Sequence, residues 1–276
     1  MEVISSRQNP TIVKVCKLSD KKHRDAEGLF RFDGVKLCAE AILSGVELEL
    51  VLLRRDRCDE VRRRIYELCG KYPEDTGVRV LVLENSLFDT VSEEKSPEGV
   101  ISVGKYIDKF HKIATINNDD PKICSENDRV MLLEDIRDPG NLGTIMRSAA
   151  ALGIDTLVLC GDCADIYNPK AVRGSMGALF RINTVRIRDG ARAVEALRRG
   201  GRRVYAAALS GDAVSLDDMT LSAGDCVAIG NEGHGLSQAV ISACDGCVII
   251  PMSAGSESLN AAIAAVIFMW EMRKAK

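Results

Sequence analysis

The chain has 276 residues, of which 46% are hydrophobic and only 4% are aromatic. This length exceeds the roughly 100–200 residues of a typical domain, so we expect two domains with cores built mainly from Val, Ile, Leu and Ala. The net charge of −3 is unlike that of most nucleic-acid-binding proteins, but the distribution of charge matters more than its sum.

The longest apolar segment without a charge, 258–270, is shorter than the about 20 residues that a membrane span needs. The N-terminus also lacks the pattern of an export signal. We therefore expect a cytoplasmic protein with no membrane contact, whose ten cysteines are reduced. The pairs Cys160/Cys163 and Cys244/Cys247 have CxxC spacing, but no neighbouring Cys or His completes a compact zinc site. No metal is predicted.

The first hundred residues alternate between helical and extended patterns. A helix is predicted to begin at Asn9-Pro10. Short strands are predicted at 29–32, 48–53, 78–83 and 99–103, with helices near 35–43 and 59–69 between them. This alternation predicts a small α/β domain over 1–106 with helices on the faces of its sheet. The polar segment 107–128, which contains the breaker Asn-Asn-Asp-Asp-Pro, is interpreted as a linker.

Two groups of cations stand out in this first region. Lysines and an arginine crowd residues 14–24, and six arginines crowd residues 54–64. Arg62 and Arg63 are therefore candidate RNA contacts. The alternative is a solvated helix face, because Asp56, Asp59 and Glu60 lie among the arginines, and the pattern leaves both interpretations open.

A second α/β pattern begins at Arg129. The apolar runs VMLLE, DTLVL, RVYAAAL, CVAIG and CVIIP are bounded by turn signals. Such runs predict a parallel sheet covered by helices on both faces, over 129–276. Ligands bind beyond the carboxyl ends of the strands in such sheets, so the loops after the strands are the candidate functional site.

The first of these loops, 134–147, leads into a helix. An apolar stripe that includes Leu142, Ile145 and Met146 is expected to face the core, with Asn141 at the N-cap position. Arg147 falls off the stripe. It is either a plain surface arginine or a residue placed to bind a phosphate near the start of the helix.

The second loop, 230–237, has three glycines in six residues, more than an ordinary turn requires. The glycines allow backbone groups to approach a ligand closely, but their spacing is not that of a dinucleotide-binding fold. Glu232 lies between two of them and is expected to be exposed, where it would hydrogen-bond a hydroxyl or an amide. His234 is interpreted as incidental.

Two further segments carry polar side chains next to predicted helices. In 249–260, Ser258 is either a simple N-cap or, with Asn260, part of a site. The helix that follows is expected to bury Leu259, Ile263, Val266, Ile267 and Trp270. The run 168–178 combines Lys170, Arg173 and Ser175 with two glycines, which is typical of an element that contacts phosphates or an RNA backbone. A plain surface loop would have the same composition.

Taken in order, these segments resemble the signature motifs of the SpoU (TrmH-like) family of RNA methyltransferases. The resemblance is carried by 141–149, 230–237, Ile250-Pro251-Met252 and Ser258-Leu259-Asn260, and also by 168–177. It covers residues 129–276. The N-terminal region is similar, less specifically, to the L30e-like substrate-binding domain of the family, through 32–36 and 96–100.

The resemblance implies a fold, a cofactor and a reaction. The C-terminal domain would be a trefoil-knotted α/β methyltransferase domain with a parallel sheet, in a homodimer that has its last helix at the interface. S-adenosylmethionine would be held by five residues, namely Gly230, Gly235, Ile250, Met252 and Leu259. Arg147 would act on a ribose 2′-hydroxyl with the help of Asn141, Glu232, Ser258 and Asn260. Many members continue the third motif with Val-Ser where this chain has Ala261-Ala262.

The extra N-terminal domain favours 23S ribosomal RNA as the substrate. Two alternatives remain: a methyltransferase that acts on tRNA, and a non-catalytic RNA-binding protein of the same fold. Binding of S-adenosylmethionine separates the second alternative from an enzyme.

Overall fold

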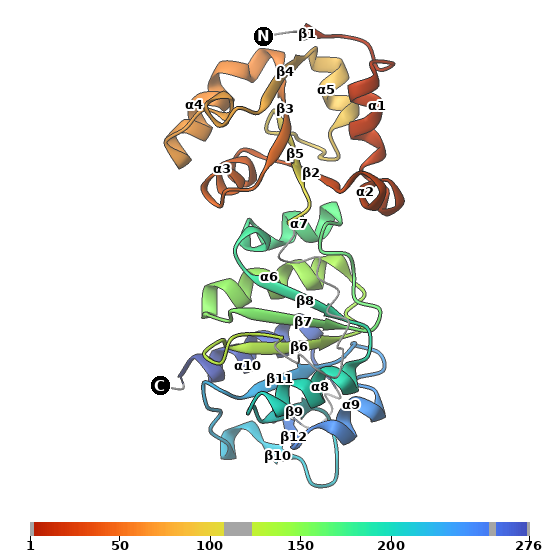
Figure 1. The fold of residues 1–276 in the computed structure, drawn as a ribbon, viewed down its shortest axis with the longest axis vertical. Helices are drawn as coiled ribbons and strands as arrows, with labels where there is room; N and C mark the ends of the chain where they lie inside the picture. The colour runs from red at the N-terminus through yellow and green to blue at the C-terminus, as the bar shows by residue number, and fades with distance from the viewer. Residues whose placement is uncertain (1–2, 108–122, 254–257, 275–276) are drawn as a thin grey trace. The chain divides into compact units, whose positions relative to one another are not determined.

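The computed structural model describes residues 3–107, 123–253 and 258–274 (Figure 1). The chain divides into two compact units, 1–107 with 165–181 and 108–164 with 182–276. The sequence pattern assigned 165–181 to the second domain, whereas its contacts are with the first unit. Most of the predicted linker lies outside the described residues. Within the described ranges, no helix has the length and apolar character that crossing a membrane requires.

The first unit contains a five-stranded sheet in the order β1-β4-β3-β5-β2. β1, β4 and β3 are parallel, and β5 is antiparallel to both of its neighbours. Four of these strands confirm the sequence prediction, and β1 was not predicted. Their bounds are Val3–Ile4 (β1), Leu29–Asp33 (β2), Leu48–Arg54 (β3), Arg79–Leu83 (β4) and Val100–Lys105 (β5).

Helices cover both faces of this sheet because side chains alternate along each strand. Leu50 and Leu52 of β3 face one core with α1 and α5, whereas Val51 and Leu53 face the other with α3 and α4. α1 begins as predicted, with the Asn9 side chain accepting a hydrogen bond from Thr11 N. The helices are α1 (Pro10–Lys17), α2 (Lys21–Glu27), α3 (Val35–Leu43), α4 (Cys58–Cys69) and α5 (Asn85–Val91).

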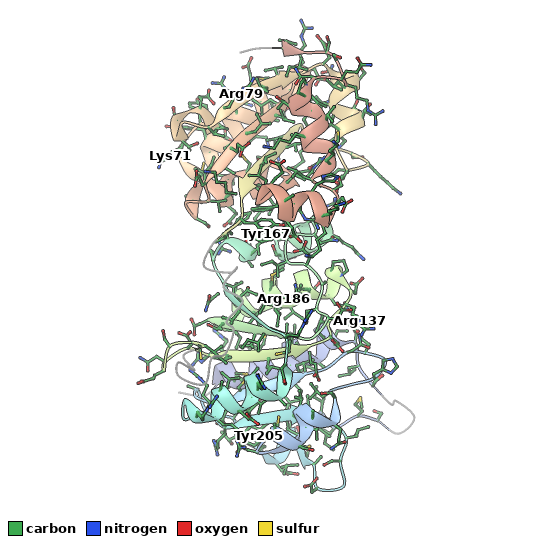
Figure 2. All side chains as sticks on the ribbon, turned by 45° about the vertical axis from the view of Figure 1, so that its right-hand side comes forward. Lys71, Arg79, Arg137, Tyr167, Arg186 and Tyr205 are labelled. Carbon is green, nitrogen blue, oxygen red and sulfur yellow. The ribbon has the colours of Figure 1, made fainter. Side chains whose placement is uncertain are left out.

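The segment 165–181 packs into this first unit. It holds α7 (Pro169–Ser175) and the short 3-10 helix η4 (Ala178–Phe180). Tyr167, which Figure 2 labels, lies with its ring centroid 4.7 Å from that of Phe30 in β2. Asp165 accepts a hydrogen bond of 2.7 Å from the buried Arg24 of α2. An aromatic cluster and a buried ion pair therefore hold this segment in the first unit.

The second unit confirms the predicted parallel sheet. Seven strands lie in the order β10-β12-β9-β11-β6-β7-β8, and each pairs in parallel with its neighbours. The bounds are Val130–Glu134 (β6), Thr156–Cys160 (β7), Asn183–Ile187 (β8), Val204–Ala207 (β9), Val214–Ser215 (β10), Cys226–Ile229 (β11) and Gly246–Ile249 (β12). β8 and β10 were not predicted. The trefoil knot stays a prediction.

Two pairs of helices cover the sheet of the second unit (Figure 1). α6 (Pro139–Leu152) packs against α10 (Ala261–Lys274), and α8 (Gly190–Arg199) packs against α9 (Gln238–Ala243). Leu132 and Ala228 belong to the core beneath α8 and α9, whereas α6 and α10 lie over the other side of the strands. Because all seven strands are parallel, their carboxyl ends lie along one edge of the sheet.

The prediction for the buried face of α10 is wrong. Ile263 is 54% exposed and Trp270 is 47% exposed. The helix instead buries the side that carries the small residues Ala261, Ala262 and Ala265 together with Phe268, Met269 and Met272. Small side chains let α10 approach α6 closely, and this contact determines which side faces inward.

The N-cap of α6 also differs from the prediction. Asp138, not Asn141, caps the helix, because its Oδ1 accepts a hydrogen bond of 2.8 Å from Asn141 N. Pro139 follows at the first helical position, where its missing N–H costs nothing. Asn141 thus lies in the first turn, and its side chain is available for other contacts.

Candidate active site

A cavity of about 370 Å³ lies at the carboxyl edge of the second sheet. The segments that follow β9, β11 and β12 form its walls together with the start of α10. Its lining is largely apolar and includes small residues such as Ala207 and Ala264. A volume in the range of about 300–1,000 Å³ is typical of sites for small molecules.

The five residues expected to hold a cofactor all line this cavity: Gly230, Gly235, Ile250, Met252 and Leu259. Glu232 and Ser258 line it too. The structure therefore brings the second and third motifs to one place, although residues 238–249 separate them along the chain. Asn141, Asn260 and Arg147 do not line the cavity.

The loop after β11 closes on itself as a tight turn. Asn231 and Gly235 exchange two backbone hydrogen bonds, of 3.2 and 2.8 Å. A Cβ atom at Gly230 would lie 2.2 Å from the carbonyl carbon of Gly235, and Gly235 has a φ of +67°. Both positions thus require glycine, Gly230 because of close backbone approach and Gly235 because of its left-handed conformation.

Asn231 anchors this loop to the end of β6. Its Nδ2 donates to the carbonyl oxygen of Asp135 at 3.0 Å, and its Oδ1 accepts from Gly233 N at 2.8 Å. Asp135 has the left-handed φ of 54°. The Asp135 carboxylate accepts a hydrogen bond of 2.6 Å from Asp162 N, in the loop after β7. Hydrogen bonds therefore join three neighbouring loops at the carboxyl edge.

Glu134 connects the same edge of the sheet to the start of α9 through hydrogen bonds. Its carboxylate is buried and accepts hydrogen bonds from the backbone N–H and the hydroxyl of Ser237, at 2.8 and 2.9 Å. The sequence interpretation assigned no role to Glu134, Asp135 or Asn231. An acidic residue that ends a hydrophobic strand was the available signal, because a buried carboxylate requires hydrogen-bond partners.

Three of the residues expected in catalysis form one hydrogen-bonded chain. Asn141 Nδ2 donates to Glu232 Oε1, and Asn141 Oδ1 accepts from Asn260 Nδ2 at 3.2 Å. These contacts span 91 and 119 residues of sequence. An ionised carboxylate only accepts hydrogen bonds, so Glu232 orients the Asn141 amide with its NH₂ toward the loop.

Asn260 has a second role as the cap of α10. Its Oδ1 accepts from Ala262 N at 2.9 Å and from Ile263 N at 3.3 Å. The cap occupies the oxygen, which leaves the Nδ2 group to bond Asn141. Ser258, the residue expected as a possible cap, is instead exposed and lines the cavity.

Arg147 is exposed on α6. The residues predicted to form the buried stripe of this helix are buried, including Leu142, Ile145 and Met146. The guanidinium of Arg147 makes no hydrogen bond or ion pair with any residue that the structure describes. The chain from Glu232 to Asn260 does not include it, so its charge remains available for a phosphate.

The arginines of α4 are largely paired within the first unit. Arg62 forms an ion pair with Glu74 and stacks over the ring of Tyr72 at 5.2 Å. The hydrogen bond to Glu74 raises the pKa of the Arg62 guanidinium. Arg63 is more exposed and lies 3.7 Å from Glu67. Arg62 is therefore engaged more fully within the first unit than Arg63, whose side chain is 71% exposed.

The three residues of α7 that were predicted to contact RNA differ in their exposure to solvent. Lys170 is exposed, and Arg173 is half exposed with Glu94 at 3.6 Å. Ser175 is fully buried, and its hydroxyl donates to the carbonyl oxygen of Val172 at 2.7 Å. A direct contact between Ser175 and RNA is therefore incompatible with this structure.

All ten cysteines are free thiols. Cys160 and Cys163 are buried, and burial raises the pKa of Cys163 to about 11. Among the described residues, no three His, Cys, Asp or Glu side chains are arranged to hold a metal ion.

The fold and this edge define a parallel α/β protein with a small-molecule cavity beside a polar network. A family model described as the SpoU rRNA Methylase family matches residues 128–270, and one described as an MRM3-like substrate binding domain matches 9–102. The chain is 31% identical over 275 residues to the 23S rRNA (guanosine(2553)-2′-O)-methyltransferase RlmP of Bacillus subtilis strain 168. That match covers 99% of this chain and 100% of the relative.

Solved structures agree over nearly the whole chain. The AdoMet-bound rRNA methyltransferase from Sinorhizobium meliloti matches with a TM-score of 0.82 and 26% identity, over 99% of this chain and 97% of that one. The SpoU methyltransferase AviRb from Streptomyces viridochromogenes, in complex with AdoMet, matches with a TM-score of 0.79 and 28% identity, over 96% and 98%. This chain belongs to the SpoU rRNA methylase family and is an RNA methyltransferase with S-adenosylmethionine as its methyl donor.

Proposed function

We propose that this chain methylates a ribose 2′-hydroxyl of 23S ribosomal RNA. The observation that carries the proposal is the hydrogen-bonded chain of Glu232, Asn141 and Asn260 beside the cavity. It joins polar groups from three distant segments where packing alone requires none. The substrate follows from the relatives, which include a 23S rRNA 2′-O-methyltransferase that aligns over its full length.

The cavity suits the nucleoside part of S-adenosylmethionine. Its largely apolar lining and the glycines of the loop after β11 match a ligand that needs an apolar slot and a few directed polar contacts. We assign the binding of the cofactor to Gly230, Gly235, Ile250, Met252 and Leu259. When bound, the cofactor supplies an electrophilic methyl group.

The residues of the chain would position the substrate hydroxyl and help to remove its proton. Glu232 has one carboxylate oxygen bonded to Asn141, which leaves the other to accept a hydrogen bond from the hydroxyl. Ser258 and Asn260 would orient the surrounding loops. Arginine has a pKa above about 12 and is a poor base, so Arg147 would instead bind a substrate phosphate and stabilise the developing alkoxide. The phosphate or solvent would take the proton.

RNA would also contact the first unit, which matches a substrate-binding domain. Lys170, Arg173 and Arg63 are its exposed candidates, and Arg62 is a weaker one because only 24% of its side chain is exposed. Because ribosomal RNA is the proposed substrate, we place the enzyme in the cytoplasm.

We further propose a homodimer that uses α10. Ile263 and Trp270 are seven residues apart and lie on the same side of the helix, and both are exposed. Covering the exposed half of each large apolar side chain would contribute about 1 kcal/mol, roughly half of the value for full burial.

The test is transfer of labelled methyl groups from S-adenosylmethionine to purified 23S rRNA and tRNA, followed by alkaline hydrolysis. Methylated 2′-oxygens block cleavage, so we expect label in alkali-resistant dinucleotides from 23S rRNA. Label in tRNA alone would assign a different substrate, and label in single nucleotides would mean base methylation. Transfer to neither RNA would contradict the proposed substrate.

A further inference from the structure

The segment 186–203 of the second unit is strongly basic. It holds seven arginines against Asp189 and Glu195, a net charge of +5 in a chain whose total is −3. The segment runs from the end of β8 through α8 to the start of β9. Figure 2 labels Arg186, which marks the β8 end. Positive charge is therefore concentrated in one short segment of the catalytic unit.

α8 places part of this charge in solvent. Ala193, Val194 and Leu197 are buried in the core. Arg192 and Arg199 are exposed, seven residues apart, and thus lie along the opposite side of the helix. Arg188 is also exposed and directly follows β8. We name Arg188, Arg192 and Arg199 the arginine ridge.

Two other arginines of the segment have structural roles. Arg202 is buried and donates to the carbonyl oxygens of Gly224, Ser125 and Glu126. Arg203 forms a two-point ion pair with the buried Asp225, with both distances 2.9 Å. Both guanidinium groups are therefore already bound to groups within the protein.

The arginines of the ridge, unlike Arg202 and Arg203, have few interactions within the protein. The side chains of Arg188 and Arg199 make no hydrogen bond or ion pair within the described parts of the chain. Arg192 lies 3.6 Å from Asp189, and both side chains are more than half exposed. Pairs of that kind are worth little and leave the charge accessible. Glu195 lies on the same side of α8 but pairs with neither neighbour among the described residues.

We propose that the arginine ridge is an RNA-backbone contact surface on the catalytic unit, distinct from the cofactor cavity. The inference rests on the proposed action on 23S rRNA. Arg188 follows the carboxyl end of β8, so the ridge begins at the sheet edge that carries the cavity and extends away from it along α8. Guanidinium groups bind phosphates in two-point geometry.

The dimensions of the ridge suit a nucleic-acid strand. Seven residues of helix separate Arg192 from Arg199, which is roughly 10 Å at 1.5 Å per residue. A duplex carries one phosphate per about 3.4 Å of its axis on each strand, so the two arginines are far enough apart to contact different phosphates. Such contacts set the position of the RNA without reading its sequence.

An acidic protein partner is a less suitable occupant. Protein interfaces centre on apolar or aromatic anchors, and no large hydrophobic side chain of 186–203 is exposed. The ridge thus offers charge without an apolar centre.

The experiment measures binding of the full-length protein to a protein-free 23S rRNA transcript over a series of KCl concentrations. The test variant is Arg192→Gln with Arg199→Gln. Each lost phosphate contact lowers the slope of log affinity against log salt by about 0.7–0.9, so we expect a decrease of about 1.4–1.8. The affinity for S-adenosylmethionine should not change, which also shows that the variant is folded.

Glu195→Gln is the matched control, because it changes the same side of α8 in the opposite direction. It should bind the transcript at least as tightly as the wild type. Equal affinity and slope for the double variant and the wild type would overturn the ridge while leaving the proposed function intact. Failure of the wild type to bind RNA would overturn both. A double variant that binds naked RNA normally but a precursor ribosomal particle weakly would assign the ridge to a protein partner and also overturn the inference.

Discussion

Asn141 has both ends of its side-chain amide engaged, the nitrogen by Glu232 and the oxygen by Asn260. Asn141→Asp would replace the donor with a second carboxylate next to Glu232, and like charges repel. We expect methyl transfer to fall by about 100-fold or more, the scale of losing one catalytic hydrogen-bond donor. Cofactor affinity, measured by calorimetry, should stay unchanged because Asn141 does not line the cavity. Thr144→Ala, one turn along α6, is the control, and equal activity of the two variants would contradict the role.

A substitution at Gly230 tests the geometry of the loop after β11. Gly230→Ala would place a Cβ atom 2.2 Å from the Gly235 backbone, whereas the same change at Gly233 meets only the Asn231 Oδ1 at 3.4 Å. We expect Gly230→Ala to weaken S-adenosylmethionine binding at least about tenfold and to lower the free energy of unfolding by about 1–3 kcal/mol. Gly233→Ala should bind and unfold nearly as the wild type does. Calorimetry and urea denaturation measure both effects, and similar behaviour of the two variants would refute the explanation.

Arg147 has no partner among the described side chains, so its removal should leave the fold intact. We expect Arg147→Ala to abolish turnover while the affinity for S-adenosylmethionine stays nearly constant. Arg147→Lys should restore only part of the activity, because an ammonium group lacks the two-point geometry of guanidinium. Loss of cofactor binding together with activity would assign Arg147 to the cofactor site instead.

At the scale of elements, 165–181 is joined to the rest of the first unit by one buried ion pair and by two exposed ones, Arg173 with Glu94 and Arg181 with Glu40. Arg24 is 2% exposed and pairs with Asp165 at 2.7 Å, whereas Arg181, which pairs with Glu40, is half exposed. Breaking the buried pair with Arg24→Met should cost about 3–5 kcal/mol, and Arg181→Met about 0–1 kcal/mol. Hydrogen exchange in 165–181 should accelerate only in Arg24→Met. Equal protection in both variants would show that the aromatic cluster alone holds the segment.

The contrast between predicted and observed elements has a physical origin. Nine of the twelve described strands followed from short apolar runs bounded by turns, because a buried strand is hydrophobic in its own local sequence. β8 was missed since only Thr184 and Ile187 of its five residues are buried. The buried side of α10 was also predicted wrongly. That helix is apolar nearly all round, so only contact with α6 decides which side is covered.

At the scale of the whole molecule, the exposed side of α10 predicts association. Trp270→Glu would place a charge on the proposed interface, and desolvating an unpaired charge is costly. We expect this variant to sediment as a monomer when the wild type sediments as a dimer. Leu43→Glu is the control, because Leu43 is 60% exposed but lies in the first unit. Dimers of Trp270→Glu would show that α10 is not the interface.

The sequence by itself determined the two α/β patterns, the parallel character of the second sheet and the loops at which polar residues gather. These properties depend on local hydrophobic periodicity and on residue types at strand ends. Only the tertiary structure decided that Asn141 bridges Glu232 and Asn260, that Ser175 is buried, and that 165–181 packs with the first unit. Each of these depends on contacts between residues far apart in the chain, and no local pattern encodes which distant partner a side chain meets.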